Sequence, residues 1–250
     1  MVCGVTYMKR RISVLLLFLL IGSMLSATNC VKRVPQQKEI EQPAQLPSEE
    51  QKLSDRENIL YKARAIESLK PKYRQRISIK DPLAGKDVWY TLDCFGFVSA
   101  VYRAANISIF GKLDSSVEGA NGVRLIYDTL KKLNKIYKKK PQVADIVFFD
   151  NTWDRINNGK INDELTHVGI VLAVDKKGTI TFIHSSVSGG VARDYANLYH
   201  PHEKTLNGVP INSNVRPRGK TDPPNTKYLA GELIHAFGTV FDIPQEGEDF

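Results

Sequence analysis

Residues 93–105 read Asp93-Cys94-Phe95-Gly96-Phe97-Val98-Ser99-Ala100-Val101-Tyr102-Arg103-Ala104-Ala105. Their apolar members recur at spacings of three and four residues, which places them on one face of an α-helix. Cys94 opens that face, so the pattern predicts a helix with Cys94 in its first turn, facing the element on which the helix packs. Asp93 is well placed to cap this helix. The face consists of Cys94, Phe97, Val98, Val101, Tyr102 and Ala105.

The rest of the chain reads as helices first and antiparallel strands after. Ser54 and Glu57 form a capping box that begins a helix, and Pro71 stops it. A further helix is predicted over about 119–135, and apolar runs predict strands over 145–149, 167–174, 179–184 and 232–240. This order predicts an α+β fold, with N-terminal helices packed on an antiparallel β-sheet. The apolar stripe of the first helix is Ile59, Leu60, Ala63, Ile66 and Leu69.

The N-terminus has the pattern of an export signal. Lys9, Arg10 and Arg11 precede the apolar run 12–21, which is too short for a comfortable membrane span. Small residues then lead to Cys30, a pattern that resembles the lipobox of bacterial lipoproteins. We expect a signal peptide over 1–29 and lipid attachment at Cys30, which would anchor the protein to a membrane in the cell envelope, facing the periplasm or cell wall. Ordinary cleavage near Ala27, leaving a soluble protein, is the alternative.

Composition predicts a tether followed by one domain. Residues 30–52 are rich in Gln, Glu, Lys and Pro and have too few apolar residues to order themselves. The catalytic domain with its C-terminal extension is predicted over 53–250, and we expect a monomer. The net charge of +8 includes a lysine cluster over 131–140. That cluster lacks aromatic interleaving and any nucleic-acid motif, so a solvated helix end is predicted and no nucleic-acid partner.

The cysteine count singles out Cys94. The chain has three cysteines, and Cys3 leaves with the signal peptide while Cys30 carries the lipid under this reading. Cys94 is then a lone thiol in an oxidising compartment, without a disulfide partner. A buried apolar cysteine is the ordinary alternative.

Two histidines are candidate partners of that thiol. If residues 175 and 178 close the hairpin of 167–174 and 179–184, His184 faces Gly169 and His167 faces Ser186. Both imidazoles then project from one face, roughly 7–8 Å apart by backbone. Cys94 would attack, His167 would accept its proton, and His184 would fix the tautomer of His167. One cysteine with scattered histidines shows no zinc-ligand spacing, so no metal or cofactor is predicted.

Four segments together resemble the NlpC/P60 family of cysteine peptidases, in the order of that family. They are residues 93–98 around Cys94, 144–149, 166–170 around His167, and 182–186 around His184. The resemblance implies a papain-like α+β fold with Cys94 as nucleophile, His167 as base and His184 as third polar residue. It also implies cleavage of peptidoglycan stem peptides, commonly between D-glutamate and a diamino acid.

The departures from that family's pattern keep alternatives open. Phe95 stands where the family has Ser, and the family's Tyr and Gly-Gly segment before the nucleophile is missing. Tyr73 and Tyr90 are candidate substitutes for that Tyr, which serves the oxyanion site, one too far from Cys94 in sequence and one too near. These departures motivate an inactive envelope-binding scaffold as a second hypothesis. Thiol acyl transfer by the same Cys94–His167 pair is a third. Residues 150–165 form an insertion with oxygen ligands that could hold calcium, but a polar surface loop is favoured because an EF-hand alignment fails. The insertion and the tail after 195 also resemble the related CHAP amidases.

Overall fold

The computed structural model describes residues 54–110, 121–220 and 222–243. The predicted signal peptide, Cys30 and the whole tether lie outside these residues. Within them no helix is long and apolar enough to cross a membrane. The three predicted helices are present as α1 (Asp55–Ser68), α2 (Cys94–Ala104) and α3 (Gly122–Lys132), and a short α4 covers Ala230–Leu233.

The helix ends follow from their capping residues. Ser54 and Glu57 form the predicted capping box at the start of α1. Asp93 accepts a hydrogen bond of 2.8 Å from the Gly96 N–H and so begins α2 at Cys94. The prediction that Leu69 belongs to the buried stripe of α1 was wrong, because Leu69 is the residue that ends the helix and it is 65% exposed.

Six antiparallel strands form the main sheet, in the order β3-β10-β4-β5-β6-β7. The predicted strands are β4 (Ile146–Phe149), β5 (His167–Val174), β6 (Thr179–Ser186) and β10 (Ile234–Gly238), the last shorter than expected. Strands β3 (Ile136–Tyr137) and β7 (Gly190–Asn197) were not predicted. Two separate hairpins, β1 (Arg76–Asp81) with β2 (Lys86–Thr91) and β8 (Thr205–Leu206) with β9 (Val209–Pro210), were also missed.

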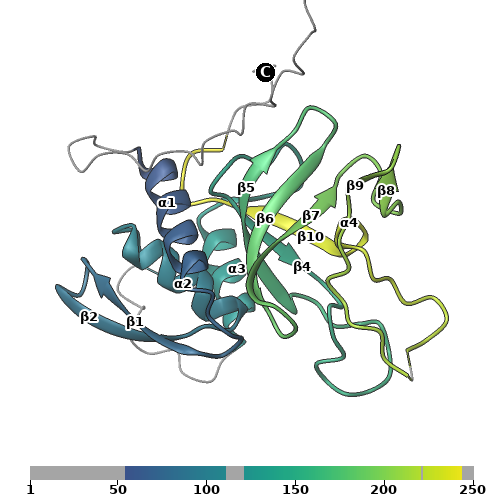
Figure 1. The fold of residues 1–250 in the computed structure, drawn as a ribbon, viewed down its shortest axis with the longest axis horizontal. Coiled ribbons are helices and arrows are strands. Elements are labelled where there is room, and N and C mark those ends of the chain that lie inside the picture. The colour runs from purple at the N-terminus through teal and green to yellow at the C-terminus, as the bar shows by residue number, and fades with distance from the viewer. Residues whose placement is uncertain (1–53, 111–120, 221, 244–250) are drawn as a thin grey trace, which may run out of the picture. The chain divides into compact units, whose positions relative to one another are not determined.

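The two faces of the sheet bury different cores. Helices α1, α2 and α3 lie together beside one face (Figure 1), and residues such as Phe97, Tyr102 and Phe148 pack there. On the other face Phe149, Phe182 and other apolar side chains pack with α4. Because β4 and β5 are covered on both faces, they are almost entirely apolar apart from His167 at the start of β5.

The β5–β6 hairpin reaches the predicted register by a different route. Asp175 and Thr179 close the turn, so the loop is one residue longer than the predicted closure by residues 175 and 178. A bulge between Val171 and Ala173 compensates for the extra residue. Ile170 therefore faces Ile183, which is the register that the prediction required at the two histidines.

Candidate active site

The Cys94 thiol lies between the start of α2 and the start of β5. Backbone N–H groups of Phe95, Val168 and Cys94 itself favour its thiolate form. Val168 directly follows His167 in β5, so the thiol lies beside the segment that carries the predicted base. Cys94 is a free cysteine and stays partly exposed.

The Cys94 thiol is protonated in the resting protein. The free N–H groups in the first turn of α2 favour the thiolate. Burial outweighs them and, together with a smaller contribution from the neighbouring Asp93 carboxylate, raises the pKa of Cys94 to about 12. The thiol is therefore neutral at physiological pH, and a base must remove its proton during attack.

His167 and His184 lie on one face of the hairpin and contact each other directly. The Nε2 atom of His167 is 2.6 Å from the Nδ1 atom of His184, with the two rings nearly perpendicular. Phe149 lies 6.0 Å from the His167 ring and Phe182 lies 5.1 Å from the His184 ring, measured between ring centroids. Burial lowers the pKa of His167 well below its usual value, and the charge of His184 lowers it further. His167 is therefore a neutral imidazole at physiological pH.

Asp194 continues this chain of hydrogen bonds and was not predicted from the sequence. Its Oδ2 atom is 2.9 Å from Nε2 of His184. It lies on β7, where His184 faces Ala192 and Phe182 faces Asp194, so Asp194 is a diagonal neighbour of His184 on the same face. The Gly189–Gly190 turn after Ser186 was the available signal, because a hairpin closed there pairs a third strand with β6.

The chain of contacts fixes the tautomers of both histidines. An ionised carboxylate only accepts hydrogen bonds, so Nε2 of His184 carries the proton that faces Asp194. In this tautomer Nδ1 of His184 accepts the proton that His167 carries on Nε2. This leaves Nδ1 of His167 with its lone pair free. The arrangement can therefore supply a neutral base beside a neutral thiol.

Of the two tyrosines proposed before the nucleophile, Tyr73 is the one near Cys94. Its pKa is raised by burial and also by the charge that Cys94 and Asp93 place nearby. The Tyr90 hydroxyl instead donates to Asp81, a buried carboxylate that also accepts from Arg103. Tyr73 thus lies near the Cys94 thiol, whereas Tyr90 supports the β1–β2 hairpin.

Two glycines allow the close packing around Cys94. A Cβ atom at Gly96 would lie 1.9 Å from the Thr91 carbonyl oxygen, so only glycine allows α2 to approach β2 this closely. A Cβ atom at Gly122 would lie 2.3 Å from the Phe95 ring. The Phe95 side chain therefore fills the space at the start of α3, where it also packs near Phe110.

With this geometry established, the chain was compared with known proteins. The model of the NlpC/P60 family matches residues 81–209, more than half of the chain. The chain belongs to the NlpC/P60 family. Neither the curated proteins nor the solved structures contain a match. Members of the NlpC/P60 family are typically peptidoglycan hydrolases of the cysteine peptidase type, and the mixed α+β architecture agrees with their papain-like fold.

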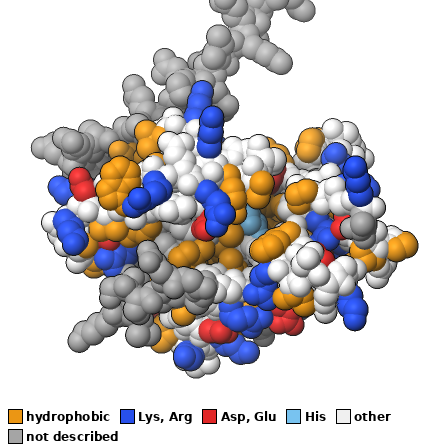
Figure 2. All heavy atoms as spheres, turned by 90° about the horizontal axis from the view of Figure 1, so that it is seen from below, with side chains coloured by type: hydrophobic (Ala, Val, Ile, Leu, Met, Phe, Trp, Pro, Cys, Tyr) orange, Lys and Arg blue, Asp and Glu red, His pale blue; other side chains and the backbone are white. Residues whose placement is uncertain are grey.

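The matched region of this NlpC/P60 protein contains Cys94, His167, His184 and Asp194. Tyr73 precedes it, and the segment after residue 209, including β10, follows it. Figure 2 shows a histidine side chain reaching the surface among hydrophobic side chains on the face seen from below. His235, on β10, contacts Asp150 at 2.8 Å, while His200 and His202 lie on an exposed loop beside Glu203 and Glu232.

The 150–165 insertion uses its carboxylates to hold its own backbone. Asp154 accepts from the N–H groups of Asn158 and Gly159, and Asp163 accepts from Ile156. Asp150 accepts from Leu165 across the base of the loop. In the part of the chain that the structure describes, no group of three acidic, histidine or cysteine residues is arranged to hold a metal ion.

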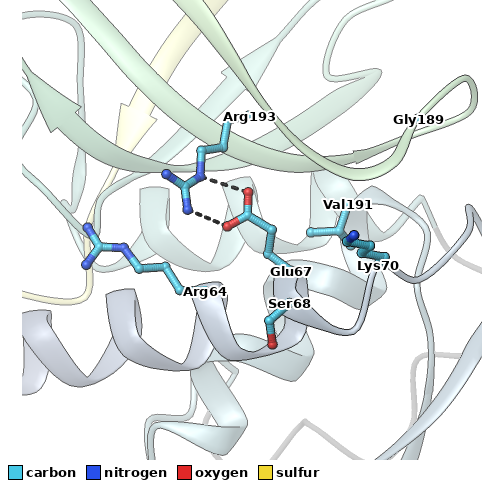
Figure 3. A pocket seen from close by; sticks show the side chains of 7 residues that line it. All are labelled: Arg64, Glu67, Ser68, Lys70, Gly189, Val191 and Arg193. Atoms are coloured by element: carbon cyan, nitrogen blue, oxygen red, sulfur yellow. Dashed lines mark hydrogen bonds and ion pairs between the residues drawn. The ribbon is translucent and has the colours of Figure 1, made fainter. Parts of the chain in front are cut away.

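A surface hollow of about 610 Å³ lies between α1 and β7. Figure 3 shows that the Arg193 guanidinium bonds both carboxylate oxygens of Glu67 across this hollow. Arg193 precedes Asp194 on β7 but projects to the helix face, away from the histidines. The Arg193–Glu67 ion pair thus joins α1 to the edge of the sheet. None of the residues that line the hollow belongs to the Cys94 site.

Proposed function

We propose that this protein hydrolyses amide bonds in peptidoglycan stem peptides, with Cys94 as nucleophile and His167 as general base. The observation that carries this proposal is the hydrogen-bonded chain from Asp194 through His184 to His167, the residue before Val168, whose backbone N–H lies at the Cys94 thiol. The chain presents a lone pair on Nδ1 of His167, which suits removal of a proton from a neutral thiol.

The reaction proceeds in two displacements. His167 takes the thiol proton as the Cys94 sulfur attacks the scissile carbonyl carbon, and the tetrahedral intermediate then expels the amine, which takes the proton from His167. A water molecule attacks the resulting thioester with His167 again as base, which releases the acid and restores the thiol. His184 and Asp194 position His167 and stabilise the imidazolium that forms in each step.

The oxyanion of each intermediate needs hydrogen-bond donors. The backbone N–H of Cys94 is one donor, since N–H groups in the first turn of a helix have no partner within the helix. The Tyr73 hydroxyl is the second donor in this proposal, supported by its electrostatic proximity to Cys94. No cofactor takes part in these steps.

The setting of the reaction follows from the N-terminal sequence and the family. We infer export through the 1–29 signal peptide, a lipid on Cys30, and a tether that lets a monomeric catalytic domain reach the cell wall from the membrane. The bond between D-glutamate and a diamino acid is the expected target, and a CHAP-type amidase bond is the alternative.

Digestion of purified sacculi tests the proposal. The wild-type protein should release stem-peptide fragments, and their masses should identify the bond that is cleaved. Cys94→Ala should abolish release while circular dichroism shows an unchanged fold. Equal release by Cys94→Ala would refute the assignment of the nucleophile.

An inactive envelope-binding scaffold is the second candidate, and the elevated pKa of Cys94 is the observation that favours it. The Phe95 ring near the nucleophile points the same way. The scaffold predicts that sacculi stay intact while the protein still co-sediments with them, and that Cys94→Ala co-sediments equally well.

A further inference from the structure

A second hollow lies beside the candidate active site and takes no part in the proposed chemistry. It has a volume of about 260 Å³ and lies between the 150–165 insertion and residues 216–219 and 222–223. The first wall carries Trp153 and Asn157, and the second carries Arg216, Pro217 and Pro223. The second wall lies beyond the region that the family model matches. The hollow is thus an addition to the family's catalytic core.

The hollow is attached directly to the residue before His167. The Trp153 indole N–H donates to the Thr166 carbonyl oxygen at 3.3 Å. Thr152 is bonded to the Thr166 hydroxyl through both its backbone N–H and its own hydroxyl, each at 2.9 Å. Thr166 and His167 are consecutive residues, about 3.8 Å apart between Cα atoms. A ligand held against Trp153 therefore lies near the start of β5, which carries the proposed base.

The walls are rigid before any ligand binds. Arg216 is 94% buried and bonds the Asn151 carbonyl oxygen at 2.7 Å and the Asp222 carboxylate at 2.6 Å, which joins one wall to the other. Asp222 also accepts from Gly219 and from the Tyr228 hydroxyl. A preformed hollow of this kind is typical of binding sites, because little ordering entropy is lost when the ligand arrives.

The chemistry of the lining selects a neutral ring with polar edges. The Trp153 side chain is about half exposed, and its N–H is already bonded, so its aromatic face is the surface offered to a ligand. Pro217 and Pro223 add apolar surface opposite. The Arg216–Asp222 pair is neutral and Asp154 leaves one negative charge in excess, which disfavours anionic ligands. Asn157 and the loop backbone supply polar groups at the rim.

We propose that this hollow binds an amino-sugar ring of the glycan strand that bears the stem peptide. The inference rests on the proposed function and extends it, because it makes the attached sugar part of the recognised substrate. Stem peptides are joined covalently to these sugars, and an extended residue spans about 3.5 Å. A sugar one or two residues from the scissile bond therefore falls within reach of a hollow that adjoins Thr166.

Two matched substrates test the inference: a disaccharide-linked stem peptide and the same peptide without sugar. The readout is the ratio of kcat/KM for the two. Trp153→Ala should lower this ratio roughly tenfold, whereas Trp153→Phe, which keeps a stacking face but loses the N–H, should retain most of it. Trp89→Ala removes a comparably exposed indole from β2 and should leave the ratio unchanged. A wild-type ratio near one, or an equal loss on both substrates in Trp153→Ala, would overturn the inference.

A binding measurement distinguishes failure of this inference from failure of the proposed function. In the Cys94→Ala protein, calorimetric titration should detect binding of the disaccharide alone, and the affinity should fall roughly tenfold on adding Trp153→Ala. This result supports the sugar site even where neither substrate is cleaved by the wild-type protein. Absence of disaccharide binding refutes the sugar site, whatever the hydrolytic activity.

Discussion

The Nε2 atom of His167 lies 2.6 Å from the Nδ1 atom of His184, and Asp194 holds the far side of the second ring at 2.9 Å. The two imidazoles belong to adjacent strands of one hairpin, so the rigid sheet sets their separation. Because each ring fixes the tautomer of the next, the orientation of the base depends on a carboxylate that does not contact the thiol.

Asp194→Asn tests this dependence. An asparagine can donate its amide N–H to His184, which reverses the tautomer of both rings and places a proton on Nδ1 of His167, where the proposed base needs a lone pair. We expect kcat to fall roughly ten- to a hundredfold, less than the about 10⁴-fold cost of replacing a carboxylate that contacts the base directly. Initial rates on stem peptides measure the effect. Asp87→Asn, an exposed acid on β2, is the control and should retain full activity; equal activity of both variants would contradict the role of Asp194.

The pH dependence of thiol alkylation reports the protonation states of Cys94 and His167 in the free protein. Burial raises the pKa of Cys94 to about 12 and lowers that of His167, so both groups are neutral near pH 7. The thiolate fraction then rises about tenfold per pH unit, and the rate of labelling by iodoacetamide should climb from pH 6 to 10 without a plateau. A labelling rate that levels off, with the midpoint of its rise below about 8.5, the usual cysteine pKa, would instead show a thiolate–imidazolium pair.

Stability against pH gives a separate measure of His167. Its pKa is lowered in the folded protein, so below about 6.5, the ordinary value, the unfolded chain takes up a proton that the folded protein does not. The free energy of unfolding should therefore fall as the pH drops from 6.5, by at most about 1.4 kcal/mol per pH unit from this group. Urea denaturation between pH 5 and 7.5 measures the slope. His167→Gln should reduce it, and an unchanged slope would contradict the burial of a neutral imidazole.

The close packing of Phe95 against Gly122 predicts a coupled pair. Gly122→Ala places a methyl group against the Phe95 ring and should destabilise the protein by about 1–3 kcal/mol. In a Phe95→Ser background the space is free, and the same change should be neutral or stabilising because alanine favours a helix over glycine by about 1 kcal/mol. Denaturation of the four proteins of this double-mutant cycle measures the coupling. Additive effects would show that the ring and Gly122 do not interact.

Ser99→Ala tests whether the core around α2 tolerates loss of a polar group. The Ser99 hydroxyl is buried and has no hydrogen-bond partner among the residues that the structure describes. Removing it should leave the free energy of unfolding unchanged or raise it by up to about 1 kcal/mol, since no bond is lost and a desolvated polar atom is removed. Thermal denaturation measures this effect, and a decrease of more than about 1 kcal/mol would show that the hydroxyl has an unseen role.

The sequence pattern alone predicted the helices and strands whose buried residues recur at a regular spacing. The stripe from Cys94 to Ala105 predicted α2 and its buried face, and the Asp93 cap placed its first residue. The apolar runs of β4, β5 and β6 were equally clear. The hairpin β1–β2 was missed because β2 is exposed or half-buried at every position, so its sequence carries no apolar alternation.

Only the tertiary structure decided how the candidate site is completed. The predicted register of the histidines proved correct although the turn and the bulge were not foreseen, because two shifts of one residue cancelled. Asp194 entered the site through the pairing of β7 with β6, and Tyr73 through the packing of the chain near Cys94. Residue types and spacing thus predicted α2, with the candidate nucleophile Cys94 in its first turn, and the two imidazoles on one face of the hairpin. The neutral state of Cys94 and its remote carboxylate depended on burial and strand pairing, which arise from contacts between segments distant in sequence.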